Sequence, residues 1–113
     1  KLGLDDLRLA VAARSAWRRR LDLAFTEVDL LVLPTTSVWP FPSDLRWPER
    51  IGDRTMDSYH RWMEVVVGGT LAGLPVLALP AALRDGLPAG VQVIGRAKSE
   101  AGLLALAASY EEA

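Results

Sequence analysis

The sequence predicts an α/β fold in which a partial mixed sheet is covered by helices. Three observations lead to this class. Apolar residues recur at three- and four-residue spacing over residues 4–28, which is typical of an amphipathic helix. Residues 30–33 form an uninterrupted apolar run closed by Pro34, which suits a strand buried on both faces. Asp85-Gly86 stands between two further apolar runs and indicates a β-hairpin.

The first helix is expected over residues 4–28. Asp5 and Asp6 fall in its first turn, where negative charge suits the helix dipole. Its single apolar stripe, which we expect to face the core, consists of Leu4, Leu7, Val11, Trp17, Leu21, Ala24, Phe25 and Val28.

A long loop and a second helix follow the first strand. Residues 35–54 carry three prolines and three aromatic residues, and a structureless connection of this length usually has a function. The second helix is predicted from about Thr55 to Leu71, with Asp53 or Thr55 as its N-cap.

The hairpin and a last helix complete the predicted fold. Gly73 ends the second helix, and Pro75 opens a strand near residues 76–79 that pairs with a strand near residues 91–94. Ser99 caps the last helix, whose inward face consists of Leu103, Leu106, Ala107 and Tyr110. Three strands and three helices cover one another only partly, so we expect further sheet neighbours from outside these residues.

Composition excludes several classes of protein. Half of the residues are apolar and 24% are charged, which is a globular composition. The net charge of -1 gives no reason to expect nucleic acid or an anionic membrane as a partner. There is no cysteine, which excludes thiol catalysis and disulfides and is consistent with a reducing cytoplasm, the expected location. Residues 65–83 carry no charge, but glycines and prolines divide them, so a buried core segment is expected rather than a membrane span.

Several segments resemble the C-terminal end of the amidase signature family. They are Gly73-Leu74-Pro75, the run from Asp85 to Gly95, the tail from Ser99 to Leu104, the segment Asp29-Leu30-Leu31-Val32-Leu33-Pro34-Thr35 and the helix Tyr59-His60-Arg61-Trp62-Met63. The resemblance implies hydrolysis of carboxamide C–N bonds through an acyl-serine intermediate, with a serine nucleophile, a second serine that follows a cis peptide bond, and a lysine. No metal or organic cofactor is implied.

The same resemblance indicates what the chain lacks. In this family the catalytic residues lie in an upstream Gly/Ser-rich segment, and nothing in this sequence corresponds to it. Residues 1–113, which begin at Lys1 without an initiator methionine, are therefore expected to be the C-terminal fragment of an amidase domain that contains no catalytic residue. Its expected partners are the upstream part of the same chain and a small-molecule amide, and homo-oligomer formation is left open.

Four candidate substrate-binding residues follow from the resemblance: Thr36, Trp39, Tyr59 and Trp62. Aromatic residues at such positions are also ordinary core residues, and that interpretation stands beside the first. Gln92, which lies on the second hairpin strand, is expected to satisfy buried backbone groups through its amide. The aromatic side chains of the predicted wall favour an apolar or aryl amide over a charged one.

Two further interpretations stay open. His60 has Asp57 and Glu64 at helical spacing, a pattern that fits a weak metal site but equally an ordinary surface helix, which we favour. The chain as a whole could instead be a noncatalytic module that docks on another protein through an open sheet edge.

Overall fold

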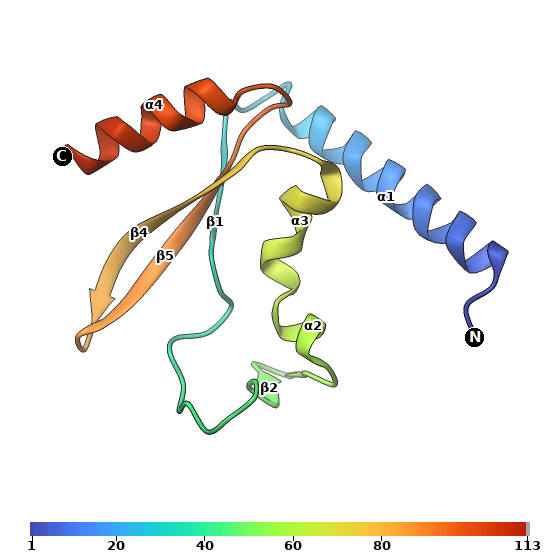
Figure 1. Cartoon of the computed structure of the whole chain (residues 1–113), viewed down its shortest axis with the longest axis horizontal. Coiled ribbons are helices and arrows are strands. Elements are labelled where there is room, and N and C mark those ends of the chain that lie inside the picture. Colours follow the sequence, from blue (N-terminus) through green and yellow to red (C-terminus); the bar gives the residue numbers. More distant parts are fainter. Residues whose placement is uncertain (113) are drawn as a thin grey trace.

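The computed structural model describes residues 1–112 and confirms the α/β class (Figure 1). Its elements, in chain order, are α1 (Leu4–Ala24), β1 (Leu31–Pro34), β2 (Arg50–Ile51), β3 (Arg54–Thr55), α2 (Tyr59–Trp62), α3 (Glu64–Ala72), β4 (Val76–Arg84), β5 (Leu87–Ile94) and α4 (Glu100–Glu111). The predicted first helix thus ends four residues early, because the chain turns at residues 25–27 before it enters β1.

β1, β5 and β4 form a three-stranded sheet in that order, with β5 at its centre. Leu31 of β1 and Val76 of β4 both lie opposite Ile94 of β5, and both pairings are antiparallel. A mixed sheet would need a parallel neighbour, and the strands within residues 1–112 do not include one.

The predicted hairpin is confirmed, and its strands are longer than expected. Asp85 and Gly86 both have positive φ, 53° and 78°, as a two-residue type I′ turn requires. The strands continue up to this turn rather than stopping at residues 79 and 91. The register shifts between Pro80 and Ala82, so a bulge follows the proline, which has no N–H to donate to the ladder.

The predicted second helix is divided into α2 and α3 at Met63. The proposed N-caps Asp53 and Thr55 are wrong, because residues 50–55 form the small β2–β3 ladder and α2 begins after Ser58. The loop over residues 35–54 is for the same reason not wholly structureless.

The end of α3 lies where the sequence predicts it. Gly73 adopts the left-handed conformation (φ 65°) and the N–H of Leu74 donates to the carbonyl of Gly69 at 3.1 Å, which closes the helix. The Gly68-Gly69 pair permits close packing, since a Cβ on Gly69 would meet Cγ2 of Val76. The uncharged residues 65–83 therefore divide into most of α3, a turn and most of β4, and no helix in the described part of the chain is long and apolar enough to cross a membrane.

Helices pack on both faces of the sheet, and each face has its own core cluster. One cluster joins the C-terminal half of α1 to the end of α3 and to β5; its buried members are Leu21, Phe25, Ala72, Leu74 and Ile94. The other joins α4 to the hairpin; its buried members are Leu79, Val93 and Leu103. Of the predicted inward face of α4, Leu103 is buried, whereas Tyr110 is partly exposed and donates its hydroxyl proton to the carbonyl of Pro80 at 2.7 Å.

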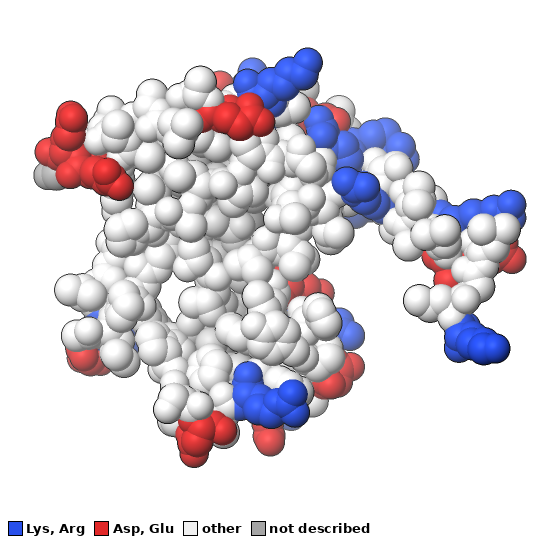
Figure 2. Space-filling view, in the orientation of Figure 1, with Lys and Arg blue, Asp and Glu red and all other residues white. Residues whose placement is uncertain are grey.

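The N-terminal half of α1 projects away from the sheet (Figures 1 and 2). Leu4, Leu7 and Val11 of the predicted apolar stripe are at least 57% exposed, so this part of the stripe contacts no core. Further along α1, three side chains hydrogen-bond the last carbonyls of α3: Trp17 donates to Gly68 at 2.8 Å, Arg14 to Leu71 at 2.6 Å and Arg18 to Ala72 at 2.9 Å.

Candidate functional site

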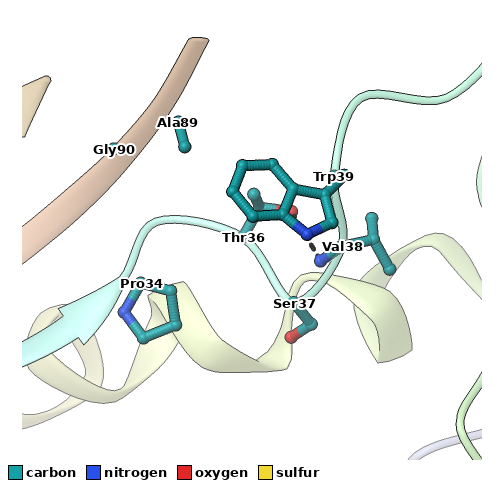
Figure 3. Close-up of a pocket in the computed structure, with 7 residues that line it drawn as sticks. All are labelled: Pro34, Thr36, Ser37, Val38, Trp39, Ala89 and Gly90. Atoms are coloured by element: carbon teal, nitrogen blue, oxygen red, sulfur yellow. Dashed lines mark hydrogen bonds between the residues drawn. The ribbon is translucent and has the colours of Figure 1, made fainter. Parts of the chain in front are cut away.

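A pocket of about 230 Å³ lies where β1 ends and the long loop begins (Figure 3). Its lining residues come from the end of β1, the first loop residues and the adjacent part of β5; they are Pro34, Thr36, Ser37, Val38, Trp39, Ala89 and Gly90. The N–H of Thr35 donates to the carbonyl of Gly90 at 3.0 Å and so holds the loop start against β5. None of the seven lining side chains titrates near neutral pH, so this lining supplies no general base.

Trp39 forms one side of this pocket and is held by the hairpin tip. The guanidinium carbon of Arg84, the last residue of β4, lies 5.0 Å from the centre of the Trp39 ring, a cation–π contact. The Trp39 side chain remains 48% exposed, so its other surface is available to a ligand.

Tyr59 and Trp62, both on α2, belong to a separate group, which we call the aromatic cluster: Phe41, Trp47, Tyr59 and Trp62. Their rings meet edge to face, with centroids 5.7 Å apart for Phe41 and Trp62 and 5.9 Å apart for Tyr59 and Trp62. The indole N–H of Trp47 donates to the carbonyl of Met56 at 3.1 Å. The indole N–H of Trp62 is buried and finds no acceptor within residues 1–112.

Gln92 joins the end of β1 to the first turn of α3. Its side-chain amide donates to the carbonyl of Pro34, at the end of β1, at 3.0 Å and to the carbonyl of Val65, in the first turn of α3, at 2.9 Å. The prediction that this amide satisfies buried backbone groups is confirmed.

The carboxylates that sequence spacing associates with His60 are engaged elsewhere. Arg61 donates to Asp57 at 3.3 Å, and this hydrogen bond, together with the charge of Arg61, holds the pKa of Asp57 below its ordinary value of 3.8. Glu64 pairs with Arg54 at 3.1 Å. Both contacts fit the interpretation of this segment as an ordinary surface helix.

Comparison with known proteins places the chain in a family. The family model described as Amidase matches residues 4–104. The chain belongs to the amidase family.

The most similar curated amidase relatives include subunits A of glutamyl-tRNA(Gln) amidotransferase. That of Chloroflexus aggregans is 37% identical over 106 residues, which make up 92% of this chain and 20% of the relative. That of Hahella chejuensis is 39% identical over 90 residues, 78% of this chain and 17% of the relative. The chain thus spans about a fifth of the length of the curated relatives that it matches.

Solved amidase structures share the fold. One described as an amidase superposes with a TM-score of 0.79 at 33% identity, covering 98% of this chain and 25% of the other. A bacterial aryl acylamidase of the amidase signature family superposes with a TM-score of 0.88 over 99% of this chain and 24% of the other, and at 24% identity this likeness concerns the fold alone.

In this amidase chain the four predicted site residues are divided between two places. Thr36 and Trp39 line the pocket, whereas Tyr59 and Trp62 belong to the aromatic cluster and are absent from its lining. Sequence reasoning missed Ala89 and Gly90, which the register of β5 against β1 brings to the pocket. It also missed Arg84, whose position next to the Asp85-Gly86 turn was the only available signal.

Proposed function

We propose that residues 1–113 are the C-terminal part of an amidase-type hydrolase that cleaves carboxamide C–N bonds through an acyl-serine intermediate. The observation that carries this proposal is the amidase match over residues 4–104, which covers nearly the whole chain. The serine nucleophile, the second serine and the lysine would come from the upstream part of the same chain. Residues 1–113 would supply three strands and one wall of the substrate pocket, and would be inactive alone.

The proposed reaction requires only the serine, the amide and water as reactants. The serine oxygen adds to the amide carbonyl, the C–N bond breaks, and the amine leaves with the proton taken from the serine. Water then cleaves the ester to release the acid and restore the serine. Backbone N–H groups would stabilise the negative oxygen that forms in both steps.

Thr36, Trp39, Tyr59 and Trp62 are the proposed substrate-binding residues. Two observations support this assignment: the pocket beside Thr36 and Trp39, and the buried indole N–H of Trp62, which has no acceptor among residues 1–112 although a buried donor normally has one. The apolar and aromatic character of both groups favours an apolar or aryl amide over a charged one. The cytoplasm is the proposed location.

The test uses the full protein with two amides of opposite character, an uncharged anilide and free glutamine, and a fluorophosphonate that labels reactive serines. We expect labelling of one serine outside residues 1–113 and faster hydrolysis of the anilide. The absence of both serine labelling and amide hydrolysis would overturn the proposed reaction. Faster hydrolysis of glutamine would overturn the proposed substrate class and leave the reaction standing.

A noncatalytic docking module is the second candidate. It is favoured by the outer edges of β1 and β4, which pair with no other strand in the described part of the chain. The same edges would accept strands from the upstream part of the chain under the first proposal. Light scattering on the full protein separates the two: a stable monomer without amide hydrolysis would favour the module.

A further inference from the structure

Gln92 is the one buried polar side chain in the core that residues 1–112 form, with 3% of its surface exposed. It lies in the central strand β5, opposite Leu33 of β1 and Ala78 of β4. Its neighbours on β5, Val91 and Val93, pack on the opposite face against α4. Gln92 therefore faces α3. Because its side chain is buried there, its amide needs hydrogen-bond partners.

One hydrogen bond of the Gln92 amide reaches the pocket lining, and the other reaches the helix turn that follows the aromatic cluster. Pro34 lines the pocket and stands two residues before Thr36. Val65 lies three residues after Trp62, in the first turn of α3, just past the break at Met63. A single NH2 group thus joins the backbone that carries Thr36 and Trp39 to the backbone that carries Tyr59 and Trp62.

The geometry of an amide makes this link stiff. The two N–H bonds of one NH2 group point in fixed directions, and a buried carbonyl that loses its donor costs about 1–3 kcal/mol. The end of β1 and the start of α3 therefore keep a constant separation for as long as Gln92 bonds both.

We propose that Gln92 is a positioning residue that sets the distance between the pocket wall and the aromatic cluster, and thereby selects amides by the size of their acyl group. This inference rests on the proposed function, since it assigns both groups to one substrate. Gln92 touches no substrate in this scheme and acts only through Pro34 and Val65.

The test compares Gln92→Leu, which removes both donors at similar volume, with Val93→Ala, a matched control on the next residue of the same strand. Val93 is equally buried but packs in the other core cluster. In the full protein, kcat and KM are measured for two anilides, one with a small and one with a bulky acyl group. Hydrogen exchange is followed by mass spectrometry in peptides covering residues 35–40 and 59–66.

We expect Gln92→Leu to change the ratio of the two kcat/KM values by about fivefold or more, chiefly through KM, and to speed exchange in both peptides. Val93→Ala should lower the melting temperature without changing that ratio. If Gln92→Leu does not fold, Gln92→Met serves as the second variant without donors.

The inference would be overturned if the Gln92 and Val93 variants had the same ratio of the two kcat/KM values and hydrogen exchange were unchanged in one or both peptides. The exchange measurement does not depend on catalysis. If the wild-type protein hydrolyses neither anilide, the proposed substrate class fails, and the exchange data alone still decide the role of Gln92. Faster exchange in both peptides of Gln92→Leu supports the link, and its absence refutes it.

Discussion

At the scale of single residues, Trp62 gives the most direct indication of a contact beyond the described residues. Its ring is fixed by edge-to-face contacts with Phe41 and Tyr59, while its indole N–H is buried without an acceptor among the described residues. Buried donors in folded proteins are nearly always paired, so an acceptor from outside this chain segment is expected. Under the proposed function, a substrate carbonyl or a group from the upstream part of the protein would satisfy the donor.

Trp62→Phe separates these two acceptors, because it keeps an aromatic ring and removes the N–H. If a substrate carbonyl accepts the hydrogen bond, KM for an aryl amide should rise about tenfold, the equivalent of roughly 1.4 kcal/mol, with little change in melting temperature. Phe41→Leu is the control, since it disturbs the same cluster without removing a donor. An unchanged KM in Trp62→Phe, with a lower melting temperature, would assign the acceptor to the protein.

Asp57 provides a pH prediction. Because Arg61 depresses the pKa of the folded carboxyl, the stabilising contribution of this pair is present above the unfolded value of 3.8 and is lost as pH falls through the folded pKa. NMR titration should place the Asp57 midpoint below 3.8, and Arg61→Met should return it toward that value. An identical midpoint in the two proteins would show that Arg61 does not act on Asp57 in solution.

At the scale of elements, α1 holds the C-terminal end of α3. The last carbonyls of a helix lack partners within the helix and carry partial negative charge, so arginine side chains bind them well. Arg14 and Arg18 donate to Leu71 and Ala72, and Trp17 donates to Gly68 one turn earlier. These three hydrogen bonds hold the C-terminal end of α3, and Gln92 hydrogen-bonds the first turn of the same helix.

Replacing both arginines, as Arg14→Met with Arg18→Met, should destabilise the full protein by about 1 kcal/mol, because both side chains are partly solvated. Hydrogen exchange near residues 69–74 should accelerate. Arg20→Met is the matched control, as Arg20 makes no side-chain hydrogen bond in the described part of the chain. Equal chemical denaturation curves for the double variant and the control would contradict the role of the pair.

The elements differ in how far sequence alone could predict them. The Asp85-Gly86 turn and the helix end at Gly73 depend on local backbone chemistry, so both were predictable. The β2–β3 ladder is also local, since the two residues Gly52-Asp53 join its strands, and this dipeptide was the signal that could have indicated it. The break at Met63 has no periodic or turn signal in the sequence. The path of the long loop is equally non-periodic, which is why the division of the four site residues between two groups could not be predicted.

At the scale of the whole molecule, residues 1–112 form a thin and extended body. Their radius of gyration is 16.6 Å, whereas a compact chain of this length would have about 13 Å. The longest extent is 49 Å and the shortest is 21 Å. This shape, the exposed N-terminal part of the apolar stripe of α1 and the two open sheet edges support the proposal that other structure covers these residues.

Residues 1–113 expressed alone should therefore be marginally stable and hydrolyse no amide. We expect strong binding of an apolar dye such as ANS, a broad urea transition and self-association in light scattering, with the full protein as the control. A monodisperse monomer with a single cooperative transition would contradict this expectation and favour an independently folding module.

The position of the hairpin in the chain also bears on the order in which the protein folds. β4 and β5 are neighbours in sequence, so their turn can close within microseconds, whereas β1 joins β5 only after the long intervening segment has been looped. Until then β5 has an unpaired edge, which can form hydrogen bonds with a strand of another molecule. We therefore expect the pocket to be among the last features to assemble, and slow pairing of β1 with β5 to favour aggregation.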